Sequence, residues 1–143
     1  MAEYQHVLVA VDLTAESKQV LDKAIQVANG ASLQLVHVIE PLAYAYGGDI
    51  PMDLSEVQNQ LQQQAVQQLA QLAEPLGVKP ENQFVLIGQP TGEIHRLAND
   101  NNIDLIVVGS HGRQGLALLL GSTANGVLHG VNCDVLAVRV NPQ

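Results

Sequence analysis

The sequence contains a single cysteine, Cys133, among 143 residues. One thiol excludes an internal disulfide, which is typical of proteins in reducing compartments. No run approaches the ~18 apolar residues that a membrane span requires. Residues 1–6 lack the basic region and apolar stretch of a secretory signal. We therefore expect a cytoplasmic protein with no membrane partner. Because Cys133 has no basic neighbour before Arg139, we also expect an inert thiol.

Aromatic and basic residues are also scarce. Aromatics make up 3% of the chain and tryptophan is absent, so the core must consist of Val, Leu, Ile and Ala. Six basic residues face 14 acidic ones, giving a net charge of −8. This balance argues against a general nucleic-acid binder, which would carry a basic face, and against an anionic membrane surface. It leaves room for a nucleotide held in a local pocket.

What remains is a chain rich in aliphatic residues. Apolar residues make up 47% and charged residues 14%, proportions typical of a globular protein. The length suits one domain, and no repeat, linker or low-complexity boundary interrupts it. We therefore predict a single domain spanning residues 1–143.

Five apolar runs rich in β-branched residues predict buried strands. They lie at residues 6–11, 33–39, 83–87, 103–108 and 135–140. Four helical patterns separate the strands, at residues 15–29, 53–76, 91–98 and 123–129. We predict that Thr14 caps the first of these helices and Thr91 the third. Strands that alternate with helices predict an α/β protein of three layers, with a parallel sheet and helices on both faces.

The longest predicted helix and the segment before it have distinct patterns. Residues 42–52 show no period and predict a loop, either a functional lid or a tolerated insertion. The helix at 53–76 combines a glutamine-rich face, expected to be solvated, with a single apolar stripe. The stripe consists of Leu54, Val57, Leu61, Ala65, Leu69, Leu72 and Leu76.

The candidate chemistry lies where predicted strands end. Asp12, Val38 and Gly109 each stand at the carboxyl end of a strand. In doubly wound sheets these ends meet at one edge, where ligands bind. Asp12 is a candidate ligand for a ribose or a phosphate-bound metal ion, since hard cations prefer carboxylate oxygens. The alternative role for Asp12 is a helix cap in the first crossover.

A glycine-rich stretch begins at the fourth strand's end. Gly109 and Gly112 are three residues apart, and Gly121, Ser122 and Thr123 precede a predicted helix. Glycines allow close approach of the backbone to an anion, and free N–H groups at a helix start hold negative charge. The pattern therefore indicates a phosphate-binding segment, or else a plain turn.

These features together resemble the universal stress protein family over nearly the full chain. The resemblance rests on residues 9–12, 37–39, 104–113, 121–123 and 133–138. It implies a five-stranded parallel sheet of order 3-2-1-4-5, of the Rossmann-like, adenine nucleotide alpha hydrolase-like kind. It also implies a homodimer formed through the last strand, Val135–Val140, and ATP as ligand with Mg²⁺ or Mn²⁺.

The resemblance places a nucleotide site on eleven residues and no catalytic residue. They are Ala10, Val11, Asp12, Val38, Gly109, His111, Gly112, Arg113, Gly121, Ser122 and Thr123. Asp12 is the candidate metal ligand, and the Val38 backbone would pair with the adenine edge. Arg113 would pair with a phosphate or be a surface charge. His111 is expected to bond the loop backbone rather than perform acid–base chemistry.

Three functions remain open at this point. A stress-related, ATP-binding regulatory protein without strong catalytic activity agrees best with the motifs. A dimeric interaction protein from the family's branch that does not bind nucleotides is the second, because eight residues separate Gly112 from Gly121 whereas ATP binders have nine. The third is a slow ATP hydrolase, although the chain has neither a Gly-Lys-Ser/Thr motif nor a Gly-x-Ser-x-Gly motif.

Overall fold

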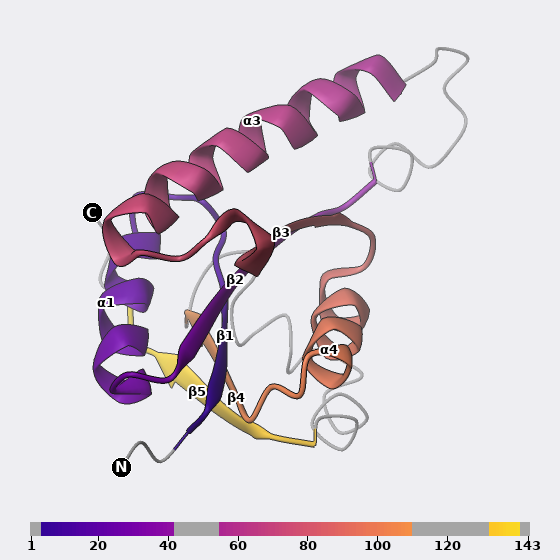
Figure 1. Ribbon diagram of the computed structural model, residues 1–143. Coiled ribbons are helices and arrows are strands. Elements are labelled where there is room, and N and C mark those ends of the chain that lie inside the picture. The colour runs from indigo at the N-terminus through magenta and orange to yellow at the C-terminus, as the bar shows by residue number, and fades with distance from the viewer. Residues whose placement is uncertain (1–3, 42–54, 110–131, 141–143) are drawn as a thin grey trace.

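The computed structural model describes residues 4–41, 55–109 and 132–140. A parallel five-stranded sheet organises them (Figure 1). Its strands are β1 (His6–Ala10), β2 (Ser32–Ile39), β3 (Gln83–Ile87), β4 (Leu105–Gly109) and β5 (Asp134–Val138). The spatial order is β3-β2-β1-β4-β5, which confirms the predicted 3-2-1-4-5 topology. In register, Val9 of β1 lies between Leu35 of β2 and Val107 of β4.

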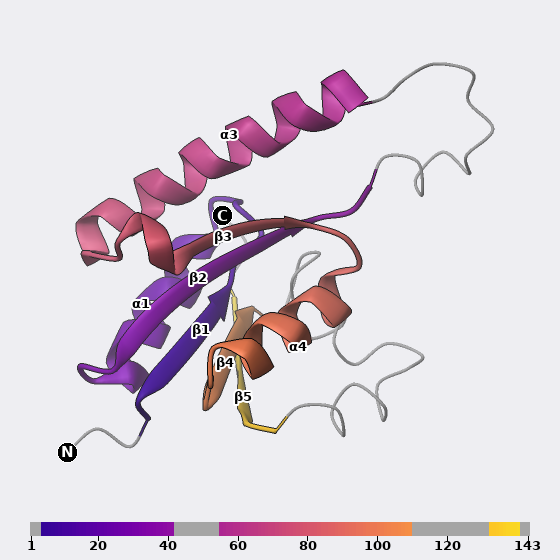
Figure 2. The ribbon, with the colours of Figure 1, turned by 45° about the vertical axis from the view of Figure 1, so that its right-hand side comes forward.

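Helices cover both faces of this sheet, as the alternating pattern predicts (Figures 1 and 2). One face carries α1 (Ser17–Ala28) and α3 (Ser55–Ala73), and the other carries α4 (Pro90–Asp100). Side chains alternate along β1, so Val7 and Val9 pack with α1 while Leu8 packs with α4. Two 3₁₀ turns, Glu74–Leu76 and Pro80–Asn82, connect α3 to β3.

The predicted element bounds differ from the observed ones by a few residues. The strand β1 stops at Ala10, because Leu13 adopts a left-handed backbone conformation with φ of 62° and the chain turns away. The strand β5 stops at Val138, two residues before the predicted end. The helix α4 is capped by Gln89, whose side chain accepts a 2.8 Å hydrogen bond from the Gly92 N–H. Thr91 is therefore inside the helix and buried, and its predicted role as the cap was wrong.

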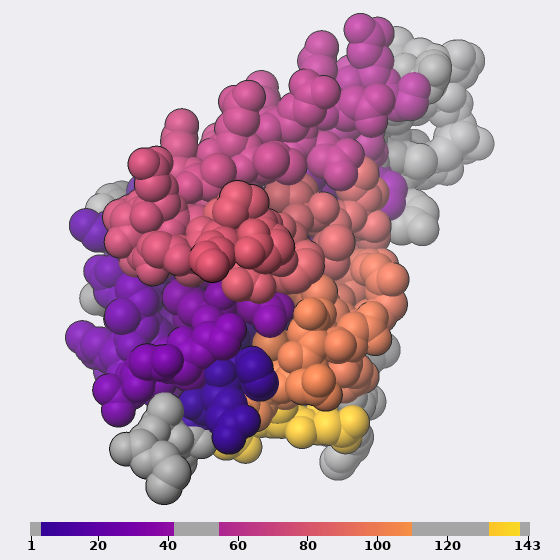
Figure 3. All heavy atoms as spheres, viewed as in Figure 1, coloured from indigo at the N-terminus to yellow at the C-terminus, as the bar shows by residue number. Residues whose placement is uncertain are grey.

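The apolar stripe of α3 is only half buried. Ala65, Leu69 and Ala73 pack against the sheet, but Val57 is 47% exposed and Leu61 38% exposed. The N-terminal part of α3 projects beyond the sheet (Figures 2 and 3), so its apolar side chains lack the cover that the stripe predicts. The glutamines fulfil the solvated-face prediction, since most of those on α3 are exposed.

A polar clamp closes the amino edge of the sheet. The Asp104 carboxylate accepts hydrogen bonds from the Gln5 N–H at 2.8 Å and the His6 N–H at 3.0 Å. The Tyr4 hydroxyl donates to Asp134 at 2.7 Å. These bonds fix the start of β1 against β4 and β5. The predicted loop at 42–52 and short helix at 123–129 lie outside the described residues. No helix among the described residues is long and apolar enough to cross a membrane.

Candidate functional site

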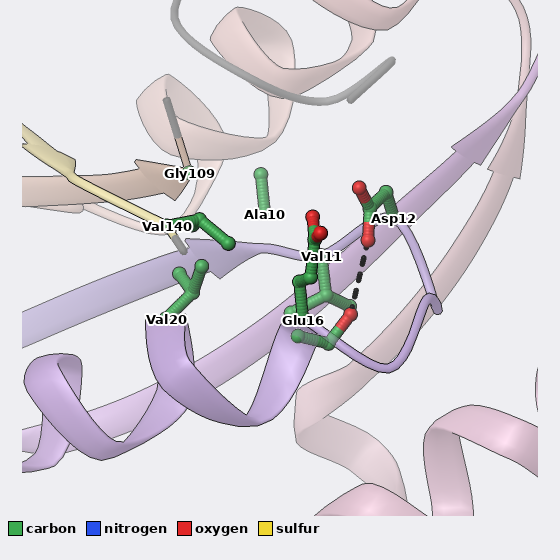
Figure 4. A pocket seen from close by; sticks show the side chains of 8 residues that line it. Ala10, Val11, Asp12, Glu16, Val20, Gly109 and Val140 are labelled. Atoms are coloured by element: carbon green, nitrogen blue, oxygen red, sulfur yellow. Dashed lines mark hydrogen bonds between the residues drawn. The ribbon is translucent and has the colours of Figure 1, made fainter. Parts of the chain in front are cut away.

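A pocket lies at the carboxyl edge of the sheet, where the ends of β1 and β4 meet the start of α1 (Figure 4). Four predicted site residues are brought together there: Ala10, Val11, Asp12 and Gly109. Its remaining described lining comes from α1, the residue before it and the chain after β5, and consists of Glu16, Ser17, Val20 and Val140. The strand-end rule for parallel sheets thus locates a real concavity in this protein.

Asp12 has two oxygens in different environments. Its Oδ1 accepts hydrogen bonds from the Thr14 N–H at 3.1 Å, the Thr14 hydroxyl at 2.7 Å and the Ser17 hydroxyl at 3.1 Å. The Thr14 hydroxyl in turn accepts a 3.3 Å bond from the Glu16 N–H. This network organises the turn before α1. The N-cap of α1 is Glu16, which has no side-chain capping bond, and Asp12 accepts no backbone N–H of the helix. The predicted cap at Thr14 and the capping alternative for Asp12 were therefore wrong, and Asp12 instead stabilises the turn that leads into the helix. Oδ2 accepts no hydrogen bond from the residues that the structure describes.

A second carboxylate, Glu16, lies beside Asp12. It precedes α1, and its side chain forms no capping hydrogen bond with the helix. In Figure 4 the Glu16 carboxylate and the outer oxygen of Asp12 point the same way, away from α1. The described lining includes no lysine or arginine. This part of the pocket is therefore negatively charged, which suits a cation and repels an unaccompanied anion.

Val38 lies on β2, next to this pocket in the sheet but outside its described lining. The Val11 N–H donates a 2.9 Å hydrogen bond to the Val36 carbonyl, so the backbone groups of Val36 face β1. Those of Val38, two residues on, face the same side because backbone groups alternate along a strand. His37 lies between Val36 and Val38 in the sequence, and its ring Nδ1 is 2.8 Å from the Val11 carbonyl oxygen.

Several predicted site residues are not among those that the structure describes. His111, Gly112, Arg113, Gly121, Ser122 and Thr123 all fall in the range 110–131. Their predicted roles stay predictions.

Sequence reasoning missed Glu16, Ser17 and Val140 as pocket residues. The position of Glu16, four residues after Asp12, was a usable signal. Ser17 at a helix start, within reach of Asp12, offered a similar signal. Val140 carried none, because its place depends on how the chain returns over the sheet after β5.

The architecture defines a class before any relative is considered. An open parallel sheet of order 3-2-1-4-5, with helices on both faces and a pocket at its carboxyl edge, is a doubly wound, Rossmann-like α/β protein. A family model described as the Universal stress protein family matches residues 3–139. The chain belongs to this family.

Individual relatives support this family assignment. The chain is 45% identical over 139 residues to "Universal stress protein A homolog 1" of Coxiella burnetii (strain RSA 493 / Nine Mile phase I), covering 94% of this chain and 96% of that one. The solved structure of universal stress protein UspA from Lactobacillus plantarum superposes with a TM-score of 0.70 at 23% identity, covering 97% and 100% of the two chains. A universal stress protein solved in complex with cAMP has a TM-score of 0.57 at 26% identity, covering 95% and 97%.

Proposed function

We propose that this protein is a stress-related regulatory protein of the cytoplasm that binds ATP at the carboxyl edge of its sheet. The observation that carries the proposal is the gathering of Ala10, Val11, Asp12 and Gly109 around one pocket at that edge. A structural neighbour at 26% identity that is in complex with cAMP supports an adenine nucleotide as the ligand class.

The ligand would extend along the strand ends. Its adenine would pair with the backbone of Val38, and its ribose and metal ion would lie near Asp12. The phosphates would lie against the glycine-rich stretch that begins at Gly109, with Arg113 as their cationic partner. This arrangement follows the family resemblance and the order of strands, since β2, β1 and β4 are consecutive in the sheet.

A divalent cation is part of the proposal because of the charge around the pocket. Asp12 and Glu16 present two carboxylates and the described lining contains no base, so a triphosphate would meet electrostatic repulsion there. Mg²⁺ or Mn²⁺ bound to the phosphates removes this repulsion and provides a positive charge for the outer oxygen of Asp12. We therefore expect nucleotide affinity to depend strongly on the metal ion.

The protein would act by occupancy rather than by turnover. Asp12 Oδ1 already accepts three hydrogen bonds, so this oxygen is committed to holding the turn rather than to activating water. Isothermal titration calorimetry with ATP, AMP and cAMP, each with and without Mg²⁺, tests the proposal. Tight metal-dependent ATP binding with little phosphate release is the expected result. Lack of binding to all three nucleotides would favour a dimeric interaction protein, and steady phosphate release a slow hydrolase.

We also propose that the protein is a homodimer formed through its last strand. In the described sheet β5 pairs only with β4, so its other edge presents backbone donors and acceptors. Such an edge needs cover or a partner. Val135 and Leu136 are only partly buried and add apolar surface. A second copy of β5 would satisfy both needs.

A further inference from the structure

A side chain joins the carboxyl ends of β1 and β2, next to a backbone hydrogen bond. The Val11 N–H donates a backbone bond to the Val36 carbonyl at 2.9 Å. Immediately after it, the Val11 carbonyl oxygen lies 2.8 Å from Nδ1 of His37. Beyond this point the strands separate, because Leu13 turns the chain with φ of 62° while β2 continues to Ile39 alongside β3.

The chemistry of this contact determines which ring nitrogen carries the hydrogen. A backbone carbonyl oxygen only accepts hydrogen bonds, so the Nδ1 of His37 must be the donor. This requirement excludes the neutral tautomer that is protonated at Nε2 alone. The ring is therefore a fixed hydrogen-bond donor that holds the end of β1 to β2.

The two residues that this bond joins precede two neighbouring contacts of the proposed nucleotide site. Val11 is followed by Asp12, which would contact the ribose and metal ion, and His37 is followed by Val38, which would contact adenine. The distance between these two contacts depends on how the two strand ends are held. We propose that His37 is a positioning residue that fixes this distance through its bond to Val11. The inference rests on the proposed nucleotide function.

Three variants separate this role from general effects of losing a histidine. His37→Asn places an amide N–H on the same Cγ that bears Nδ1 and so retains a donor, whereas His37→Leu removes it. His95→Leu is the matched control, because His95 lies on α4 and its buried Nε2 has no hydrogen-bond partner among the described residues. ATP affinity is measured by calorimetry with Mg²⁺ present, at a temperature where all variants are folded by circular dichroism.

We expect His37→Leu to weaken ATP binding about tenfold, the effect of one lost hydrogen bond on a contact geometry. His37→Asn and His95→Leu should stay within about threefold of the wild type. Equal affinity in the wild type and His37→Leu would overturn the positioning role while leaving nucleotide binding intact. Failure of His37→Asn to restore affinity would also overturn it, because a retained donor would then make no difference. Failure of the wild type itself to bind would overturn the proposed function and this inference with it.

A second measurement needs no nucleotide. Long-range ¹H–¹⁵N correlation spectra of the imidazole rings distinguish the two neutral tautomers. At a pH where the ring is neutral, His37 should be protonated at Nδ1. A ring protonated at Nε2 would overturn the inference whatever the affinities show.

Discussion

The Ser17 hydroxyl donates a 3.1 Å hydrogen bond to Oδ1 of Asp12. The bond connects the first residue of α1 to the segment that follows β1. Thr14 donates two further bonds to the same oxygen. The two oxygens of one carboxylate thus have separate tasks. Oδ1 holds the turn into the helix, and Oδ2 points away from α1, as the Glu16 carboxylate does (Figure 4). Holding the turn before α1 and contacting a ligand are compatible roles for Asp12, because each uses a different oxygen.

Because the two oxygens of Asp12 have different roles, two substitutions of this residue should have different outcomes. Asp12→Asn retains an oxygen that accepts the bonds from Thr14 and Ser17, but it removes the negative charge. We expect stability within about 1 kcal/mol of the wild type and a large loss of Mg²⁺-dependent ATP affinity. Asp12→Ala removes the acceptor as well and should lower the free energy of unfolding by about 1–3 kcal/mol. Urea unfolding and calorimetry measure the two effects.

The control is Asp22→Asn, which removes an exposed aspartate from α1 away from this pocket. It should change neither quantity. If Asp12→Asn bound ATP as well as the wild type in Mg²⁺, the charge of Asp12 would have no part in ligand binding, and its role would be structural alone.

Removal of the Glu16 charge should have the opposite effect on ATP affinity from removal of the Asp12 charge. Its carboxylate adds negative charge to the pocket without a capping hydrogen bond to the helix. Glu16→Gln should therefore raise affinity for metal-free ATP by about two- to fivefold, because one partly exposed repulsion disappears. The gain should shrink when Mg²⁺ is present. Glu81→Gln, an exposed substitution far along the chain, serves as the control in the same titrations. If Glu16→Gln bound metal-free ATP with unchanged affinity, the Glu16 carboxylate would not repel the phosphates.

The fold was predictable because its signals are local. Each strand is a short run of β-branched and aliphatic residues, and the alternation with helices leaves few topologies. The predicted bounds were less reliable where a tertiary contact decides them. Leu13 ends β1 by a left-handed turn that no propensity indicates, and Gln89 replaces Thr91 as the cap of α4. Likewise, the apolar residues Val57 and Leu61 predict burial, but both are exposed on the N-terminal part of α3.

The site was predictable in part for a related reason. Asp12 lies just after β1 and Gly109 ends β4, and the strand-end rule places them together without any knowledge of side-chain packing. Glu16 and Val140 required the orientation of α1 and the return path of the chain after β5, which the sequence pattern does not encode. The bond between His37 and Val11 is of the same kind, because it joins residues 26 positions apart through a side chain.

Cys133 should be an unreactive thiol at neutral pH. Burial, together with the carboxylates of Asp134 and Asp104, raises its pKa to about 11. The thiolate fraction below pH 9 is then about 100-fold lower than for a thiol of pKa 9, and thiol modification should be slowed similarly. Rates of reaction with a disulfide reagent, measured from pH 7 to pH 10, check this expectation. A fast reaction at pH 7, in a folded sample, would contradict it.

The same pKa gives a signed effect on stability. The folded state holds the thiol proton more tightly than the unfolded chain, so this contribution is full below about pH 9 and is lost as pH rises towards 11. The free energy of unfolding, measured with urea, should therefore fall more over this pH range in the wild type than in Cys133→Ala. The difference between the two proteins isolates the thiol from lysines and tyrosines that titrate at similar pH. Parallel pH profiles would show that the thiol pKa is the same in the folded and unfolded states.

The proposed dimer can be tested on Ala137, an exposed residue of β5. In a twofold interface between two copies of β5 each substitution occurs twice, near the symmetry axis. Ala137→Glu would thus place two like charges close together and should shift the protein towards monomer at micromolar concentration in sedimentation velocity. Ala70→Glu adds the same charge to an exposed position of α3 and should leave the dimer intact. A monomeric wild type would refute dimer formation at that concentration. A dimer unaffected by Ala137→Glu would place the interface on another surface, because two glutamates buried at a shared strand edge would be incompatible with stable pairing.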